Sequence, residues 1–291
     1  MDYVKPNEVL SAMIDAGKAK AELSVLQLIV RGALGGAILA CATTLAYTAT
    51  AQTGLPLVGA ILFPVGFVMI ILLGLELVTG SFALVPLAVL EKRTTTSRML
   101  RNFFWVIIGH LLGCAAYAAL YGLTLTKMGT DMSNPLIQTL ITTSEAKTVA
   151  YKAMGGDGML LAFIKAVLCN WMVTLGAVLA MTSKSTAGKI AAMWLPILTF
   201  FAQGFEHTVV NFFVIPAGML LGASVSLADW WVWNGVPVLL GNFAGGMLFT
   251  GLLLYLSHKG FRRSAGAPEA GLSFLSEDAA AVKSPVLEKS L

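Results

Sequence analysis

Apolar residues fill long stretches of this chain, and short polar segments separate these stretches. A helix that crosses the hydrocarbon core of a membrane needs about 20 consecutive, mostly apolar residues. Stretches of at least that length cover residues 28–51, 57–90, 103–125, 159–182, 190–222 and 236–257. The pattern therefore predicts an all-α membrane protein with six membrane-spanning helices.

The composition agrees with this prediction, because 57% of the 291 residues are hydrophobic and only 12% are charged. The mean hydropathy is +0.81. A soluble domain needs more charge to cover its surface. The net charge of +4 is carried by short loops between apolar stretches, a pattern that sets membrane topology and does not indicate nucleic-acid binding.

Lys and Arg are distributed unequally between the two sets of loops. They occur before the first stretch, in segments 91–101 and 183–189, and at the start of the C-terminal tail, whereas segments 52–56 and 223–235 contain none. Loops rich in Lys and Arg stay in the cytoplasm. We therefore expect a multi-pass protein of the cell (inner) membrane with both termini cytoplasmic.

The ends of the chain differ from the apolar middle. Residues 1–27 predict a cytoplasmic amphipathic helix along the membrane interface, with one side made of Val9, Ala12, Met13, Ala16 and Leu23. Residues 28–263 form the six-span domain. Residues 264–291 are rich in Ala, Ser, Glu and Lys without periodicity, so we expect a disordered cytoplasmic tail.

The second and fifth stretches are too long for one straight helix, and they resemble each other. Each contains Gly-x-Glu at its middle, ending at Glu76 and at Glu206, and each has a proline upstream and another downstream. The third and sixth stretches also correspond, through Gly109-His110-Leu111-Leu112-Gly113 and Gly241-Asn242-Phe243-Ala244-Gly245. Two related halves with three spans each have opposite orientations, which predicts an inverted repeat.

The two Gly-x-Glu segments predict a solute pathway. A glutamate at mid-depth in a membrane is costly and faces the protein interior or a water-lined cavity. Glycine permits a helix to break there, and non-helical backbone is tolerated only where protein buries it or it lines a pore. A helix that restarts after such a break directs its N-terminal amides inward, where they attract anions. We expect an anion pathway, with Glu76 and Glu206 holding the two breaks.

Five segments of the chain are similar to the formate/nitrite transporter family. They are Lys5-Pro6-Asn7-Glu8, Gly17-Lys18-Ala19, Gly74-Leu75-Glu76-Leu77-Val78-Thr79-Gly80, Leu168-Cys169-Asn170-Trp171 and Gly204-Phe205-Glu206-His207-Thr208-Val209-Val210-Asn211. The resemblance extends from about Pro6 to Arg263. It implies a homopentamer of aquaporin-like protomers, each with its own pore.

The same resemblance implies roles for individual residues. His207 is then the central pore histidine, with Thr79 facing it. Asn170 and Asn242 steady the broken segments. The family's vestibule lysine corresponds to Lys147, with Lys152 as a rival. The implied constrictions are Phe63, Phe67 and Phe200 on the cytoplasmic side and Leu77 and Val173 on the periplasmic side.

His110 departs from the family, which usually has Asn at this position. We expect it to form a hydrogen bond between packed helices. The three cysteines, Cys41, Cys114 and Cys169, lie in apolar stretches without the spacing of a metal site. We therefore expect no metal, no disulfide and no cofactor.

The predicted substrates are small monovalent acid anions, formate or nitrite, with hydrosulfide, acetate and lactate left open. A bare anion is costly to place in an apolar constriction, whereas a protonated weak acid is not. Histidine titrates near neutral pH, so His207 is expected to supply or relay that proton. An aquaporin-like channel for neutral solutes is the alternative, although the sequence has no Asn-Pro-Ala pair. A nucleophile with a nearby base is also missing from the pattern, so we do not expect an enzyme.

Overall fold

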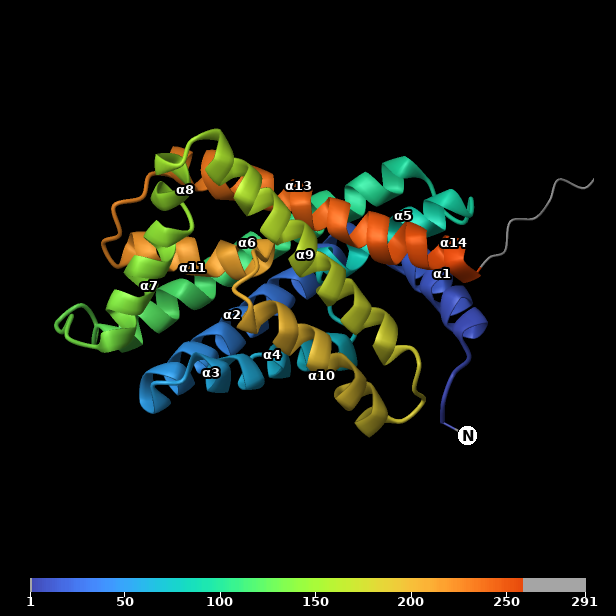
Figure 1. Ribbon diagram of the computed structural model, residues 1–291, viewed down its shortest axis with the longest axis horizontal. Coiled ribbons are helices and arrows are strands. Elements are labelled where there is room, and N and C mark those ends of the chain that lie inside the picture. The colour runs from blue at the N-terminus through green and yellow to red at the C-terminus, as the bar shows by residue number, and fades with distance from the viewer. Residues whose placement is uncertain (1, 259–291) are drawn as a thin grey trace, which may run out of the picture. The chain divides into compact units, whose positions relative to one another are not determined.

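The computed structural model describes residues 2–258, and the regular secondary structure of these residues is helical, apart from one isolated bridge between Tyr3 and Ser183 (Figure 1). The predicted all-α class is confirmed. The tail predicted for residues 264–291 lies outside the described residues. The helices of the first half are α1 (Pro6–Glu22), α2 (Val25–Thr53), α3 (Pro56–Leu62), α4 (Pro64–Leu72), α5 (Val78–Leu90) and α6 (Thr96–Leu125).

The second half continues with α7 (Pro135–Ala146), α8 (Val149–Ala153), α9 (Gly156–Ala180), α10 (Thr186–Ala202), α11 (Thr208–Leu220) and α12 (Leu227–Trp230). The π-helical segment η1 (Trp231–Gly235), α13 (Val236–Gly245), the π-helical segment η2 (Gly246–Leu253) and α14 (Leu254–His258) complete it.

Among the described residues, four helices are long and apolar enough to cross a membrane by length and composition. They are α2, α6, α9 and the continuous run from Leu227 to His258. Shorter apolar helices cover Pro56–Leu72, Val78–Leu90, Thr186–Ala202 and Thr208–Leu220. The shorter helices thus form two pairs, which are separated by residues 73–77 and 203–207.

The two separating segments end their helices in the same way. Gly74 and Gly204 each have a φ of +63°, a left-handed conformation that favours glycine. The next amide in each segment bonds back to the helix, from Leu75 N to Ile70 O at 3.0 Å and from Phe205 N to Phe200 O at 3.2 Å. This is the hydrogen-bond pattern of a Schellman cap, which stops a helix. Gly74 therefore ends α4, and Gly204 ends α10.

Small residues bring α6 against α2 and α13 against α9. A Cβ atom on Gly113 would overlap the carbonyl oxygen of Ala33, and one on Gly245 would overlap that of Val167. Small residues at this spacing let helix backbones approach closely in a membrane. The repeated Gly-x-x-x-Gly pattern of the third and sixth apolar stretches thus sets the same helix contact in each half.

The N-terminal helix α1 packs against α5. Its buried residues are Val9, Met13, Gly17 and Ala21, spaced four apart, whereas Ala12 is exposed. The apolar side of α1 is therefore rotated from the predicted one, because the helix packs on protein through a close contact at Gly17. This packing places Lys20 near the first break.

Candidate functional site

The two segments that separate the helix pairs, residues 73–77 and 203–207, lead to Thr79 and His207, whose side chains contact each other. Thr79 lies in the first turn of α5, and His207 directly precedes α11. Thr79 Oγ1 is 3.1 Å from His207 Nε2, and both side chains are buried. His207 Nδ1 accepts a hydrogen bond from the amide of Val210 at 3.3 Å. A neutral ring therefore carries its proton on Nε2 and donates it to Thr79, whose own hydroxyl hydrogen stays available for another acceptor.

Glu206 is the centre of a buried polar network. Its carboxylate accepts hydrogen bonds from Lys147 Nζ at 2.8 Å, Tyr151 OH at 2.8 Å and Asn211 Nδ2 at 2.7 Å. Asn234 Nδ2 lies 3.4 Å away and also donates to the carbonyl of Lys147. The glutamate side chain is only 2% exposed, and that of Lys147 is 17% exposed. A buried carboxylate needs such partners, and this network supplies them to Glu206 beside the second break.

Lys152 lies elsewhere. Its ammonium group pairs with Asp229 at 2.7 Å, and its side chain is 54% exposed. Of the two candidate lysines, the structure brings Lys147 to Glu206 and leaves Lys152 at the surface.

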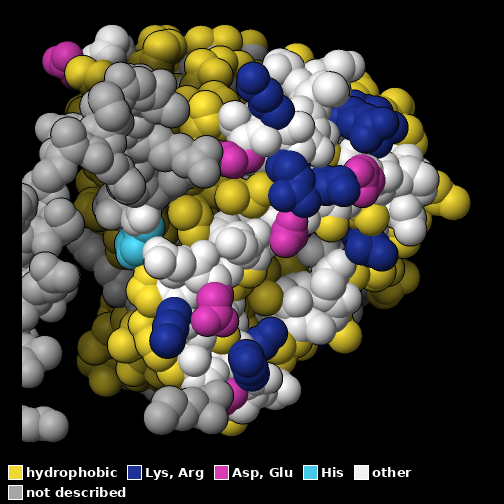
Figure 2. Space-filling view, turned by 90° about the vertical axis from the view of Figure 1, so that its right-hand side faces the viewer, with side chains coloured by type: hydrophobic (Ala, Val, Ile, Leu, Met, Phe, Trp, Pro, Cys, Tyr) yellow, Lys and Arg dark blue, Asp and Glu magenta, His cyan; other side chains and the backbone are white. Residues whose placement is uncertain are grey.

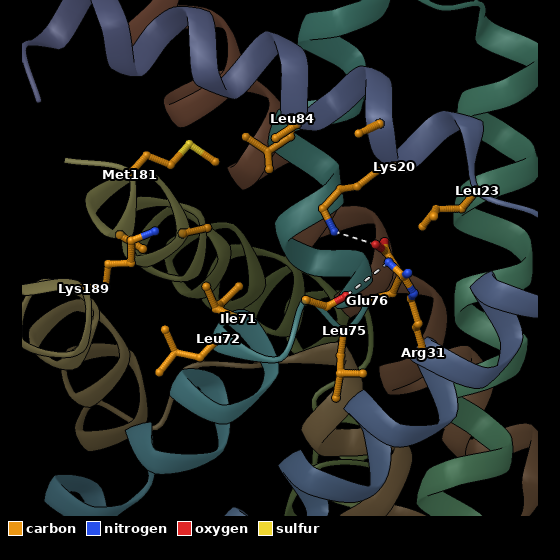
Figure 3. Close-up of a pocket in the computed structure, with 15 residues that line it drawn as sticks. Lys20, Leu23, Arg31, Ile71, Leu72, Leu75, Glu76, Leu84, Met181 and Lys189 are labelled. Carbon is orange, nitrogen blue, oxygen red and sulfur yellow. Dashed lines mark hydrogen bonds and ion pairs between the residues drawn. The ribbon is translucent and has the colours of Figure 1, made fainter. Parts of the chain in front are cut away.

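The first break has a corresponding network, which the sequence did not reveal. Lys20 of α1 donates to Glu76 at 2.9 Å, and Ser81 Oγ donates to the same carboxylate at 3.4 Å. Arg31 Nη1 donates to the carbonyl of Gly74 at 3.3 Å. Figure 3 shows Lys20 and Glu76 pointing toward each other while Arg31 lies beside them. Lys20 precedes α2 and Lys147 precedes α9, and this matching position before a long helix is the sequence signal that would have identified the Lys20–Glu76 pair.

Asn170 and Asn242 connect the two breaks to the helices around them. Asn170 Nδ2 donates to the carbonyls of Thr79 at 3.1 Å and Asn242 at 2.6 Å. Asn242 accepts a hydrogen bond from the Thr208 amide at 2.8 Å and donates to the Glu206 carbonyl at 2.9 Å. Asn242 thus contacts the segment 203–207 directly, and Asn170 contacts the first turn of α5 and the backbone of Asn242.

His110 contacts two other helices. Its Nδ1 is 2.7 Å from the carbonyl oxygen of Gly32 in α2, which is the expected bond between packed helices. Its Nε2 accepts a hydrogen bond from the amide of Val78 at 3.1 Å, which the sequence did not predict. Val78 is the first residue of α5, as Thr208 is of α11. His110 therefore occupies the place that Asn242 has in the second half.

Two cavities open beside the two ion pairs. One has a volume of about 420 Å³, and its lining includes Lys20, Arg31, Glu76 and Lys189. Figure 3 shows Lys189 on the wall opposite the Lys20–Glu76 pair. The other has a volume of about 520 Å³ and is lined by Lys147, Lys165, Tyr151, Glu206, His207 and Phe200, among others.

The predicted constriction residues are all buried. Phe63 packs against Phe200 with a ring separation of 5.6 Å, and Phe200 stacks on His207 at 5.5 Å. Phe67, Leu77 and Val173 are buried in the main apolar core.

One expectation for Phe200 does not agree with the structure. The sequence placed Phe200 and Lys147 on opposite sides of the pore, but both line the second cavity. The reason is that Phe200 lies in the last turn of α10, directly before the break, and so sits beside His207.

A helical chain with several membrane-length apolar helices and paired Lys–Glu contacts at two helix breaks is an integral membrane protein. The family model for the formate/nitrite transporter matches residues 7–256. The chain therefore belongs to the formate/nitrite transporter family, as its motifs predicted.

Relatives and solved structures agree with this membership. The chain is 33% identical to a probable formate transporter of Methanothermobacter thermautotrophicus, over 88% of this chain and 97% of the relative. It is 32% identical to the uncharacterized transporter YrhG of Bacillus subtilis (89% and 95%) and 27% identical to the formate channel FocA of Escherichia coli (88% and 94%). An FNT family ion channel superposes with a TM-score of 0.69 at 23% identity (84% and 97%), and a pentameric formate channel with formate bound superposes with 0.65 at 22% (81% and 98%). At such identities the solved structures support the fold. Family membership does not favour the aquaporin-like alternative.

Proposed function

We propose that the chain is a transmembrane channel or transporter for small monovalent acid anions, formate or nitrite. The observation that carries this proposal is the buried Thr79–His207 contact, because it joins the two breaks next to a cavity that contains a lysine. The names of relatives, a probable formate transporter and formate channels, support formate as a substrate. Nitrite, hydrosulfide, acetate and lactate are also small monovalent anions of weak acids and belong to the same proposal.

The proposed architecture has six spans in an inverted repeat. Residues 56–90 form one interrupted span, with α3 and α4 before the break and α5 after it. Residues 186–220 form the other, with α10 and α11. Four long helices supply the remaining spans. A pentamer is supported by the solved pentameric formate channel that this fold resembles, and one pore in each protomer is part of the same proposal.

The two cavities are proposed to be the vestibules of the pore. The first is lined by three cationic side chains, Lys20, Arg31 and Lys189, and by one carboxylate, Glu76. Lys147 is the vestibule lysine of the second cavity. Excess positive charge in a recess raises the local concentration of anions. The Phe63–Phe200 contact is proposed as the constriction on the Lys147 side of the pore centre, with Phe67, Leu77 and Val173 as further apolar constriction residues.

We place both termini and the Lys20 cavity on the cytoplasmic side of the inner membrane. Figure 2 views the side on which α1 and α14 lie in Figure 1, and Lys and Arg side chains gather there. Such enrichment is characteristic of the cytoplasmic side. A cysteine placed at Ser226, before the last long helix, is then reached by an impermeant label from outside. Labelling from the inside only would reverse this orientation.

The hydrogen bonds of His207 indicate which group supplies the proton that accompanies the anion. A histidine gives up a proton without becoming anionic only from the imidazolium form, in which both ring nitrogens carry hydrogens. In that form Nδ1–H of His207 would face the Val210 amide, which is also a donor. We therefore propose that the neutral ring of His207 donates its Nε2–H to Thr79, that the Thr79 hydroxyl donates to the anion, and that water supplies the proton that accompanies the anion.

The test is uptake by purified protein in liposomes, with each of the five anions at pH 5 and at pH 8. We expect uptake of formate or nitrite, faster at the lower pH, where protons are more available. His207→Asn keeps a donor and is expected to keep the wild-type pH profile, whereas His207→Phe removes it and reduces uptake about tenfold or more. A changed pH profile in His207→Asn would show that the ring itself supplies the proton. Absence of uptake for every anion in the wild-type protein would refute the proposed function.

A further inference from the structure

His110 is a buried histidine that the proposed transport chemistry does not use. Its side chain is 0% exposed and lies in the middle of α6. The carbonyl oxygen of Gly32 only accepts hydrogen bonds, and the amide of Val78 only donates them. Both contacts are satisfied together by one form of the ring alone, the neutral tautomer with its proton on Nδ1.

The amide of Val78 has a particular need for this acceptor. It is the first amide of α5, and the first amides of a helix have no partner within the helix. The preceding residue, Leu77, offers no side-chain acceptor. Val78 is fully buried, and inside a membrane an amide without a partner is costly because no water replaces it. His110 supplies the acceptor that neither the helix nor the solvent provides.

In the second half of the protein, the first amide of α11 also bonds to a side chain of another helix, but that side chain is shorter. Asn242 accepts from the Thr208 amide through Oδ1 at 2.8 Å. His110 uses Nε2, which lies farther from the Cα atom than an asparagine oxygen does. The imidazole therefore spans a wider gap between α6 and the beginning of α5. Thr79 follows Val78 directly, so this gap also sets where the Thr79 hydroxyl stands relative to His207, now 3.1 Å away.

We propose that His110 is a positioning residue of the pore, which as the neutral Nδ1–H tautomer fixes the beginning of α5 and thereby places Thr79 opposite His207. This inference rests on the proposed function only for its effect on transport. The contact itself and the tautomer are properties of the folded protein.

The first test is nuclear magnetic resonance of the protein in lipid with ¹⁵N-labelled histidine. The chain has only three histidines, and the signals lost in His110→Gln identify those of His110. We expect one protonated and one unprotonated ring nitrogen at neutral pH, with the proton on Nδ1. A proton on Nε2, or on both nitrogens, would overturn the proposal, and this measurement does not depend on transport.

The second test compares His110→Gln with His110→Leu. Glutamine places an oxygen near the position of Nε2, whereas leucine has a similar bulk and no acceptor. Hydrogen exchange at the Val78 amide is expected to stay close to wild type in the Gln variant and to become about tenfold faster in the Leu variant. Anion uptake is expected to stay within about twofold of wild type with Gln and to fall about tenfold with Leu.

The outcomes separate the two proposals. If wild-type protein transports no anion while Val78 exchange follows this order, the proposed function is wrong and the structural role of His110 stands. If wild-type protein transports anions and the Leu variant does so at the same rate, His110 does not position the pore. Unchanged Val78 protection in the Leu variant would also contradict the proposal.

Discussion

Replacing Lys147 with methionine tests whether this lysine, and not Lys152, holds the second break. Lys147→Met leaves the Glu206 carboxylate, which is 2% exposed, with neutral donors only, Tyr151, Asn211 and Asn234. Breaking a buried ion pair by removing one partner costs about 3–5 kcal/mol. Because three neutral hydrogen bonds to the carboxylate remain, we expect a loss of stability of about 3 kcal/mol, the lower end of that range.

The matched control is Lys152→Met. Lys152 pairs with Asp229, but its side chain is 54% exposed, and exposed ion pairs contribute about 0–1 kcal/mol. Unfolding of the purified protein in detergent, followed by thermal or denaturant titration, measures both losses. Uptake in liposomes is expected to fall in Lys147→Met, because its cavity loses the cation nearest to Glu206, and to stay near wild type in Lys152→Met.

A double variant isolates the role of charge. Lys147→Met combined with Glu206→Gln has no buried carboxylate, and Gln still offers an acceptor for Tyr151 and Asn211. We expect it to regain most of the stability lost in Lys147→Met, without regaining uptake. The reasoning is refuted if Lys152→Met is as destabilising as Lys147→Met, or if the double variant is no more stable than the single one.

Two further predictions concern the first half of the protein. Glu76→Gln should keep more uptake than Glu76→Ala, because Gln retains an acceptor for Lys20 whereas Ala leaves the partly buried Lys20 ammonium group without this partner. Complete loss in both variants, with normal folding, would show that the charge itself is needed. Gly113→Ala should disrupt assembly of α2 with α6, because its Cβ atom would overlap the carbonyl oxygen of Ala33. Gly122→Ala in the same helix, where a Cβ atom meets no neighbour, should be neutral or more stable by about 0.5–1 kcal/mol, and equal stability of the two Ala variants would contradict the close helix contact.

The sequence alone determined the features that depend on neighbouring residues. The apolar stretches predicted the helical class, and Gly-x-Glu predicted where two of them break. Gly74 and Gly204 adopt the left-handed backbone conformation that made a break the expected outcome. The motif around His207 identified the family, and the repeated Gly-x-x-x-Gly pattern has a close helix contact in each half. These features are local because a backbone conformation or a helix face is specified within a few residues.

Tertiary structure decided which side chains share a site. Lys147 and Lys152 are five residues apart on the chain, but the turn between α7 and α8 directs only Lys147 to Glu206, 59 positions away. The sequence did not indicate that Lys20 reaches Glu76 across 56 positions, because that contact depends on how α1 packs against α5.

Packing between distant helices also explains why the sequence did not predict the second hydrogen bond of His110 or the cavity that Phe200 lines. The partners of His110 lie 78 positions away in α2 and 32 positions away at the beginning of α5, so its second hydrogen bond exists only after three helices have packed. Phe200 lines the Lys147 cavity because α10 ends beside His207, and no pattern within α10 records this. Local sequence specifies where a helix starts and stops, whereas contacts between distant helices depend on the close packing of all of them at once.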